Sequence, residues 1–394
     1  MSVARKIDQI MATSSWIRKM FEQGARLKAE HGVDKVFDFS LGNPNLPPPE
    51  KFNQILRDTV DSCGLDDHCY MPQAGYPQVC VSIAEYLSTE QAAAVTCNDV
   101  IMTCGAAGAL NVILKALLDP GDEVLTPMPC FVEYRFYADN HGGVLKMVAT
   151  RPDFTLDIEA IGQAISAKTK VVLINSPNNP TGQIYDKTSL DALGSLLTEK
   201  SDQYGHVIYL VSDEPYRKII YDDASVPSIF TSYRDSIIAT SYSKDISIPG
   251  ERIGFAAVNP MAAHRESLMA GMALTNRILG FVNAPALMQR VVACMQGMSV
   301  DIGEYKRKRD LLCDGLAEAG YEFIVPPGAF YLFPRTPVAD DVEFVRALQK
   351  ELILVVPGSG FAGPGHFRIA FCVPDQTIVN ALPGFKRVMQ QYRS

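Results

Sequence analysis

The sequence predicts an α/β fold, in which helices cover both faces of a mostly parallel β-sheet and a smaller α+β domain lies beside it. From about residue 51 to residue 280, short apolar runs alternate with segments of helical periodicity. Such alternation is typical of parallel strands that are joined by helices. The length of 394 residues would also usually divide into two domains.

Seven apolar segments rich in β-branched residues are expected to form the sheet, because strands buried on both faces are continuously apolar. They comprise residues 100–103, 123–126, 144–148, 170–175, 207–212, 236–240 and 253–258. Helical patterns separate several of them, at residues 110–118, 156–165 and 189–197.

The pattern changes after residue 283, where the sequence predicts one long helix that continues to about residue 319. Two more strands, within 329–333 and 367–372, and a closing helix over 375–392 would complete the smaller α+β unit. Residues 42–49 form a rigid loop rich in proline, which we interpret as a crossing between domains.

Composition excludes several classes of function. The net charge is -8, from 36 basic and 44 acidic residues without any basic block, so nucleic acid and anionic membranes are poor candidates for partners. No apolar run approaches the ~20 residues of a membrane helix, and the first 31 residues have no secretory signal pattern. The nine scattered cysteines and six histidines show no metal-ligand spacing. We therefore expect reduced thiols, no metal and a cytoplasmic enzyme.

Lys244 is the first candidate for chemistry. It follows Ser241 and Ser243, and Arg252 lies eight positions downstream. A lysine attacks a carbonyl only when it is uncharged, and burial or neighbouring cations lower its pKa enough for that. The serines and the arginine could bind a phosphate. This combination suggests pyridoxal phosphate, although a serine-rich loop with a solvated lysine would read the same way.

Asp213 and Tyr216 follow the apolar run that begins at residue 207. A carboxylate at the end of a buried strand could pair with the pyridine nitrogen of such a cofactor and keep it protonated. Tyr216 could donate to the phenolic oxygen of the ring. Taken alone, Asp213 could equally cap a helix, and Tyr216 could be a core aromatic residue.

Two further segments follow predicted strands. Asn179 lies in an Asn-Pro turn that could aim its amide into a site, or the turn could simply reverse the chain. Gly105, Ala106 and Ala107 open a helix, where small residues let backbone amides approach a phosphate. Tight packing of helix on sheet would explain these small residues as well. Because Asn179, Asp213 and Lys244 each follow the carboxyl end of a strand, we expect them at one edge of the sheet.

Together these segments resemble the class I/II aminotransferases of the fold-type I pyridoxal-phosphate enzymes, in particular aspartate aminotransferase. The resemblance runs from about residue 39 to the C-terminus. Its motifs are Gly105-Ala-Ala-Gly-Ala-Leu, Pro129-Cys-Phe131-Val-Glu-Tyr134, Pro177-Asn-Asn179-Pro-Thr-Gly, Asp213-Glu-Pro-Tyr216, Ser241-Tyr-Ser-Lys244 with Arg252, and Phe367-Arg368-Ile.

The resemblance implies a large cofactor-binding domain at residues 49–284 with a seven-stranded sheet. Residues 1–48 and 285–394 would then form the small domain. It also implies a homodimer with shared active sites, because Tyr70 matches a tyrosine that reaches the phosphate of the neighbouring subunit. The active site would lie between the domains.

The family's roles carry over residue by residue. Lys244 would form the Schiff base and move the α-proton, with Asp213 and Tyr216 as further catalytic residues. The cofactor would be held by residues matching the family's phosphate and ring contacts: Tyr70, Gly105, Ala106, Ala107, Phe131, Asn179, Asp213, Tyr216, Ser241, Ser243, Lys244 and Arg252. The substrate would be held by Gly42, Asn179 and Arg368. Without the family, Arg368 would be taken for a surface residue at a strand edge.

The implied function is a ping-pong transfer of an amino group from an L-amino acid, with aspartate as the family's default, to a 2-oxo acid. Many relatives have Trp or Tyr where this chain has Phe131, and we identify no basic residue that would bind a side-chain carboxylate. A β-eliminating lyase of the same fold would need the same Lys244 and Asp213. A non-catalytic DNA-binding regulator is disfavoured, because no basic patch is present.

Overall fold

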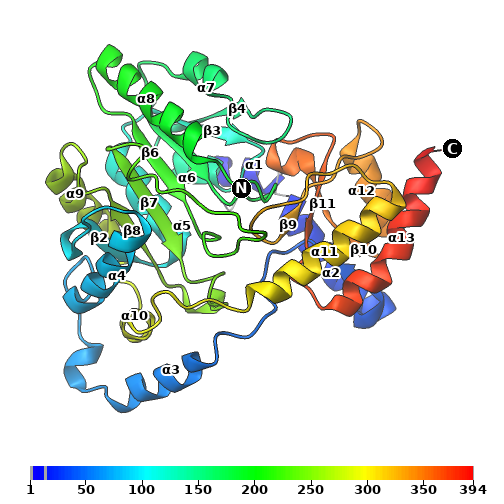
Figure 1. Ribbon diagram of the computed structural model, residues 1–394, viewed down its shortest axis with the longest axis horizontal. Coiled ribbons are helices and arrows are strands. Elements are labelled where there is room, and N and C mark those ends of the chain that lie inside the picture. The colour runs from blue at the N-terminus through cyan, green and yellow to red at the C-terminus, as the bar shows by residue number, and fades with distance from the viewer. Residues whose placement is uncertain (1–2, 13–15, 394) are drawn as a thin grey trace.

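The computed structural model describes residues 3–12 and 16–393, and its larger part is built on a seven-stranded sheet (Figure 1). The strands are β2 (Val100–Thr103), β3 (Glu123–Met128), β4 (Val144–Ala149), β5 (Thr169–Asn175), β6 (Tyr209–Asp213), β7 (Ser236–Ser241) and β8 (Gly254–Val258). Their order is β2-β8-β7-β6-β5-β3-β4, and β8 runs antiparallel to both of its neighbours. The predicted fold class and all seven strands are confirmed.

Helices cover both faces of this sheet, because successive strand residues point to opposite sides. Leu210 belongs to one apolar cluster and Val211 to the other. The first cluster includes side chains of α4 (Pro77–Glu90), α7 (Ile158–Ala164), α8 (Lys187–Tyr204) and α10 (Ala286–Ala293). The second includes side chains of α5 (Gly105–Leu117), α6 (Tyr134–Asn140) and α9 (Arg265–Ile278). Helix α3 (Lys51–Asp61) packs against α10.

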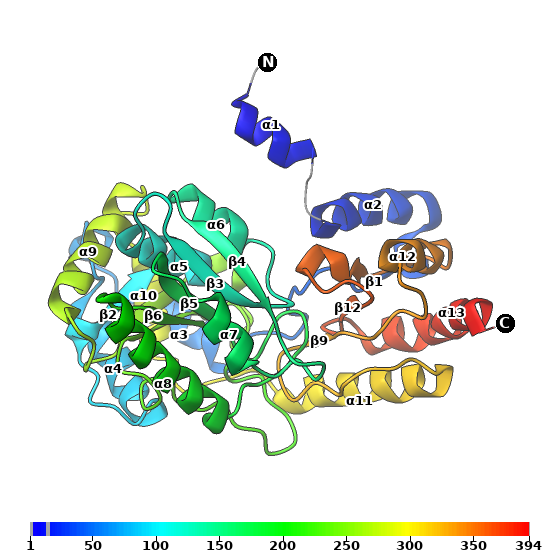
Figure 2. The same ribbon diagram turned by 90° about the horizontal axis from the view of Figure 1, so that it is seen from above.

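A smaller part with its own apolar cluster lies beside the large sheet (Figure 2). It contains two small sheets, β1 with β10 in parallel and the antiparallel order β11-β12-β9. Their bounds are β1 (Phe37–Asp38), β9 (Tyr331–Leu332), β10 (Ile353–Leu354), β11 (Val356–Pro357) and β12 (Phe367–Ala370). The helices of the N-terminal and C-terminal segments are α1 (Arg5–Ala12), α2 (Trp16–His31), α11 (Ile302–Ala319), α12 (Asp341–Lys350) and α13 (Asp375–Arg393).

The predicted long helix from residue 283 to residue 319 is wrong, because the structure divides it into α10 and α11. Gly297 takes a positive φ of 79° between them, a conformation that interrupts a helix. The side chain of Asp301 then caps the start of α11 by accepting a hydrogen bond from the amide of Gly303. The strand expected at 329–333 is reduced to β9, since Ala329 has a φ of 55°.

Parallel pairing brings the carboxyl ends of β5, β6 and β7 to the same edge of the large sheet. Asn175 lies opposite Asp213, and Asp213 lies opposite Ala239. The smaller part reaches this edge, since Arg368 on β12 bonds to Asn179 beyond β5. Among the described residues, no helix has the length and apolar character needed to cross a membrane.

Candidate active site

A cavity of about 280 Å³ lies where the carboxyl edge of the sheet meets the smaller part. Most of the residues that the sequence singled out line its wall. They are Gly42, Ala106, Ala107, Phe131, Asn179, Asp213, Tyr216, Ser241, Ser243, Lys244, Arg252 and Arg368. The fold thus brings together residues that lie more than 300 positions apart in the chain.

Lys244 follows β7 and projects into this cavity. Its Nζ donates a hydrogen bond of 2.7 Å to the backbone carbonyl of Gly42. Burial lowers the pKa of the amine to about 8, and the positive charges of Arg368 and Arg252 act in the same direction. A substantial fraction of the amine is therefore neutral near physiological pH, as a nucleophile requires.

Asp213 ends β6 and is buried beneath the cavity. The hydroxyl of Tyr134 donates to its Oδ2 at 2.6 Å, whereas its Oδ1 has no hydrogen-bond partner among the described residues. Burial raises the pKa of the carboxyl to about 7; the bond from Tyr134 opposes this shift and the charge of Glu214 adds to it. The free oxygen fits a cationic N–H donor, which would restore the charged form.

Hydrogen bonds of Asn175 connect the carboxyl end of β5 with that of β6 and with Asn179. The amide nitrogen of the Asn175 side chain donates to the backbone carbonyl of Asp213 at 2.7 Å. Its oxygen accepts from the backbone amide of Asn179, also at 2.7 Å. These bonds fix Asp213 and Asn179 relative to each other.

The hydroxyl of Tyr216 lies 2.7 Å from that of Tyr331 on β9. Both phenols are buried and line the cavity. Burial raises the pKa of Tyr216 well above its ordinary value, so its hydroxyl stays protonated and can donate a hydrogen bond to a ligand oxygen.

One end of the cavity suits an anion. Helix α5 begins at Gly105, and the N-terminal residues Ala106 and Ala107 line the wall with Arg252. Gly105 has a φ of 73°, and a Cβ there would come within 2.9 Å of the Arg252 Nη2. The positive φ favours glycine, and a side chain there would push the Arg252 guanidinium away from the start of the helix. Helix amides, a guanidinium and the hydroxyl of Ser241 together fit a phosphate.

Arg368 lies on the central strand of the small antiparallel sheet and is 2% exposed. Its guanidinium lies between the rings of Tyr331 and Phe361, at 4.7 and 4.6 Å from their centroids. It donates to Asn179 Oδ1 at 2.9 Å and to the carbonyl of Ser40 at 2.6 Å, while its Nε has no partner among the described residues. The expectation of a surface residue, drawn from local sequence alone, is wrong because the apolar strand is covered on both sides.

Two predicted residues lie outside the cavity wall. Gly105 lies directly behind it, in contact range of Arg252. Tyr70 is 90% exposed and does not line the cavity of its own chain. Phe131 lines the cavity and packs edge-on against Tyr134, with ring centroids 5.6 Å apart.

Among the residues that sequence reasoning missed are the hydrogen-bond partners of the predicted ones: Asn175, Tyr134 and Tyr331. Asn175 could have been found as the polar last residue of an apolar strand. Tyr134 belongs to the quoted Pro-x-Phe-x-x-Tyr motif, but its contact with Asp213 spans 79 residues. Tyr331 had no signal, because it belongs to an apolar run typical of a core strand.

Known proteins resemble this chain in sequence and in architecture. The profile of the family described as "Aminotransferase class I and II" matches residues 34–384. The "Aspartate/prephenate aminotransferase" of Thermus thermophilus is 32% identical over 364 residues, which cover 91% of this chain and 92% of the relative. The "Aspartate aminotransferase" of Thermotoga maritima is 29% identical over 96% of this chain and 97% of its own.

Solved structures agree with these relatives. The crystal structure of an amino transferase from Eubacterium rectale superposes with a TM-score of 0.97 at 36% identity, covering 100% of both chains. Aspartate aminotransferase from Thermus thermophilus with maleate gives a TM-score of 0.86 at 28% identity, covering 98% of this chain and 100% of the other. The family match spans most of the chain and the fold agrees throughout; the chain belongs to the class I and II aminotransferases and is a transferase of fold type I.

Proposed function

We propose that this aminotransferase uses pyridoxal phosphate to move an amino group between an L-amino acid and a 2-oxo acid. Lys244, Asp213 and Tyr216 are its catalytic residues. The observation that carries the proposal is the meeting, in one cavity, of a lysine whose pKa is lowered and a buried carboxylate whose Oδ1 has no partner in the part of the chain that the structure describes.

The residues present fit the cofactor. Members of this family use pyridoxal phosphate, and the cavity of about 280 Å³ offers one group for each of its functional parts. The start of α5 with Ser241, Ser243 and Arg252 would hold the phosphate. Phe131 would stack on the ring, Asp213 Oδ1 would accept from the ring nitrogen, and Tyr216 with Asn179 would reach the phenolic oxygen.

When bound, pyridoxal phosphate supplies a carbonyl for amines and a ring that withdraws electrons from the substrate Cα. The chain's own groups do the rest. Lys244 presents a neutral Nζ, which can accept the proton from the substrate Cα and return it. Asp213 keeps a negative charge beneath the ring, where it stabilises developing charge because water is excluded.

Arg368 is proposed to bind the substrate α-carboxylate. Its buried guanidinium has an Nε without a partner within residues 3–12 and 16–393, and its planar fork matches a carboxylate. Asn179 already holds one of its nitrogens, so the fork is oriented before any substrate arrives. The backbone of Gly42, whose carbonyl accepts from Lys244, would lie beside the same carboxylate.

The cavity wall is compatible with two classes of substrate side chain. Relatives are named for aspartate and prephenate, so aspartate is one candidate donor. Three cations line the described cavity wall, Lys244, Arg252 and Arg368, and each already has a proposed role. Leu41, Leu110 and Tyr331 add apolar surface to the wall. An amino acid with a neutral side chain is therefore the second candidate.

The test is a screen of half-reactions. Purified enzyme loaded with pyridoxal phosphate is mixed with each amino acid in turn, and loss of the absorbance of the lysine-bound cofactor is recorded. We expect the 2-oxo acid to form in stoichiometric amount, and the cofactor signal to return only when a second 2-oxo acid is added. Release of ammonia with pyruvate, without any added 2-oxo acid, would instead indicate a lyase.

We also propose the domain division 49–284 against 1–48 with 285–394. The separate apolar clusters of the two parts support this division. Residues 286–295, which include α10, depart from it because they pack in the apolar cluster of the larger domain.

The exposed Tyr70 supports a homodimer in which it completes the neighbouring phosphate site. The free cysteines support a reducing, cytoplasmic location.

A further inference from the structure

The two loops that carry Asp213 and Lys244 have a second face, turned away from the cavity. Glu214 directly follows Asp213, and Asp245 directly follows Lys244. Both of these neighbouring carboxylates are buried, and both line a separate, smaller cavity behind the active site. The proposed chemistry uses neither of them.

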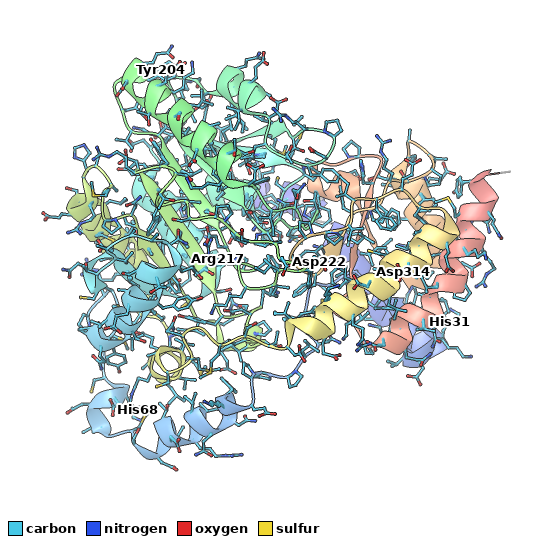
Figure 3. All side chains as sticks on the ribbon, in the orientation of Figure 1. His31, His68, Tyr204, Arg217, Asp222 and Asp314 are labelled. Carbon is cyan, nitrogen blue, oxygen red and sulfur yellow. The ribbon has the colours of Figure 1, made fainter. Side chains whose placement is uncertain are left out.

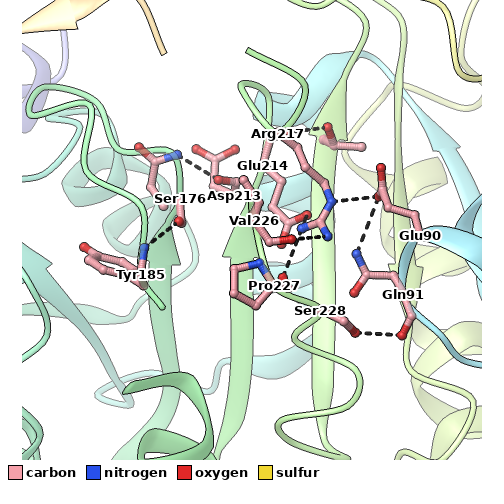
Figure 4. A network of polar contacts seen from close by, with 12 residues as sticks. Glu90, Gln91, Ser176, Tyr185, Asp213, Glu214, Arg217, Val226, Pro227 and Ser228 are labelled. Atoms are coloured by element: carbon pink, nitrogen blue, oxygen red, sulfur yellow. Dashed lines mark hydrogen bonds and ion pairs between the residues drawn. The ribbon is translucent and has the colours of Figure 1, made fainter. Parts of the chain in front are cut away.

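Arg217 is the centre of the polar contacts on this second face (Figure 4). Its Nε lies 2.9 Å from a carboxylate oxygen of Glu90 on α4, and its Nη1 lies 3.0 Å from Glu214 Oε2. The same guanidinium donates to the carbonyls of Val226 at 2.9 Å and Pro227 at 3.3 Å. Four groups from three separate segments are thus held by one side chain.

The side chain of Arg217, labelled in Figure 3 among the elements of the larger part, is only 10% exposed. Burial opposes its charge, yet the carboxylates of Glu214 and Glu90 raise its pKa above the ordinary arginine value. The guanidinium therefore stays charged, and each carboxylate beside it stays paired. A buried pair of this kind has a defined geometry because neither partner can turn to water.

A second pair supports the loop that carries Lys244. The Nζ of Lys218 lies 3.1 Å from Asp245 Oδ2 and 4.9 Å from the centre of the Tyr86 ring. The hydroxyl of Tyr86 donates to Glu90, which links this pair to the first one. Within residues 213–218, Asp213 and Tyr216 therefore face the active-site cavity, whereas Glu214, Arg217 and Lys218 face the smaller cavity behind it.

The contacts at Glu214 restrict Asp213 directly. The Glu214 amide donates to the carbonyl of Ala239 at 2.8 Å, and its carbonyl accepts from the Thr240 hydroxyl at 3.0 Å. A shift of Glu214 moves Asp213, since adjacent Cα atoms are held about 3.8 Å apart. Displacements of about 1 Å at a reacting group can cost about 10²-fold in rate.

We propose that Arg217 is a positioning residue for the reaction: by holding Glu214 and Glu90 together it fixes Asp213 and Tyr216 against the cofactor ring. This inference rests on the proposed function, because it presumes the roles given there to Asp213 and Tyr216. Arg217 itself does not line the active-site cavity and acts only through its neighbours.

The test compares Arg217→Met and Arg217→Lys with Arg265→Met. Arg265 forms a comparable pair, 2.9 Å from the fully buried Asp99, before β2 at the opposite edge of the sheet. For Arg217→Met we expect kcat to fall about 10²-fold, with a smaller change in KM. The dissociation constant of pyridoxal phosphate for the apoenzyme should rise about tenfold, because Asp213 no longer meets the ring nitrogen correctly. Arg265→Met should lower thermal stability but leave both quantities within about twofold.

Arg217→Lys keeps the charge but cannot reach four acceptors, so an intermediate loss of kcat and of cofactor affinity is expected. This variant decides the question if Arg217→Met does not fold. If the Arg217 variants resemble Arg265→Met at equal loss of melting temperature, the positioning role is overturned. Failure of the wild-type chain to attach pyridoxal phosphate to Lys244 would instead overturn the proposed function itself.

Discussion

The two faces of the loops after β6 and β7 differ in how their charged groups are satisfied. On the rear face, Glu214 and Asp245 are paired with Arg217 and Lys218. On the cavity face, Asp213 Oδ1 and Arg368 Nε are the atoms of charged side chains that are buried without a partner in the described part of the chain. The loop after β6 thus carries a paired carboxylate on its rear side and, on its cavity side, a carboxylate with one oxygen that has no partner among the described residues.

The difference indicates where a ligand belongs. An unsatisfied buried polar group costs about 1–3 kcal/mol, so the cavity face is held in a costly arrangement by a rear face that is well bonded. A cofactor and substrate that pair with Asp213 and Arg368 would recover this cost. The largest effects of mutation should therefore come from the cavity face.

Replacement of Lys244 by alanine should have the largest effect. Turnover should fall by at least about 10³-fold, because the chain loses both its nucleophile and its proton carrier. Borohydride reduction followed by peptide mass mapping should label Lys244 in the wild type and no residue in the variant. A label on another lysine would show that Lys244 is wrongly assigned; an unchanged circular dichroism spectrum is the control for folding.

Asp213→Ala should still attach the cofactor to Lys244, with affinity weakened at least as much as in Arg217→Met, and should lose about 10²–10³-fold in the rate of the half-reaction, as expected when an electrostatic group is removed from a closed site. Single-turnover absorbance measurements give this rate. Tyr134→Phe is the matched control, because it removes only the hydrogen bond to Asp213 and should cost about 1 kcal/mol. Near-normal rates in Asp213→Ala would refute its role beneath the ring.

Arg368→Lys should weaken binding of both the amino acid and the oxo acid by about 2–3 kcal/mol, since lysine keeps the charge but loses the planar fork. Cofactor occupancy and its absorbance should not change. Substrate titrations of the loaded enzyme measure the affinities. Loss of pyridoxal phosphate, with substrate binding intact, would mean that the arginine serves the cofactor instead.

The smallest expected effect is the pH dependence of the apoprotein's free energy of unfolding. The folded chain holds the pKa of Lys244 at about 8, below its ordinary 10.5. Well below pH 8 the amine is charged in both the folded and the unfolded state, and its burial destabilises the fold. Above this value the folded chain releases the proton first, and stability rises with pH until the unfolded amine also titrates.

Between about pH 8.5 and 9.5, the free energy of unfolding of wild-type apoprotein should therefore rise by about 1 kcal/mol relative to Lys244→Met. Denaturant titrations at each pH measure both proteins. Arg368, Arg252 and Cys372 face the same amine and are present in both proteins, so the comparison isolates Lys244. Parallel pH profiles would contradict the lowered pKa.

Local pattern predicted the large sheet well, and it failed where a single backbone conformation decided the outcome. The seven strands are runs of apolar residues that must be buried on both faces, and the composition of each run shows this requirement. The break between α10 and α11 depends on Gly297 and on the Asp301 cap. Glycine is tolerated within many helices, so this interruption could not be read from periodicity.

By itself, the sequence determined the order of strands and helices, and with it the edge of the sheet where Asn179, Asp213 and Lys244 meet. This follows from the parallel strand–helix–strand connections, which place successive carboxyl ends on one side. Only the tertiary structure decided that Arg368 is buried, that Tyr134 bonds to Asp213 and that Arg217 joins Glu90 to Glu214. These contacts link residues from 3 to 189 positions apart, and most depend on how separate elements pack, which no local pattern records.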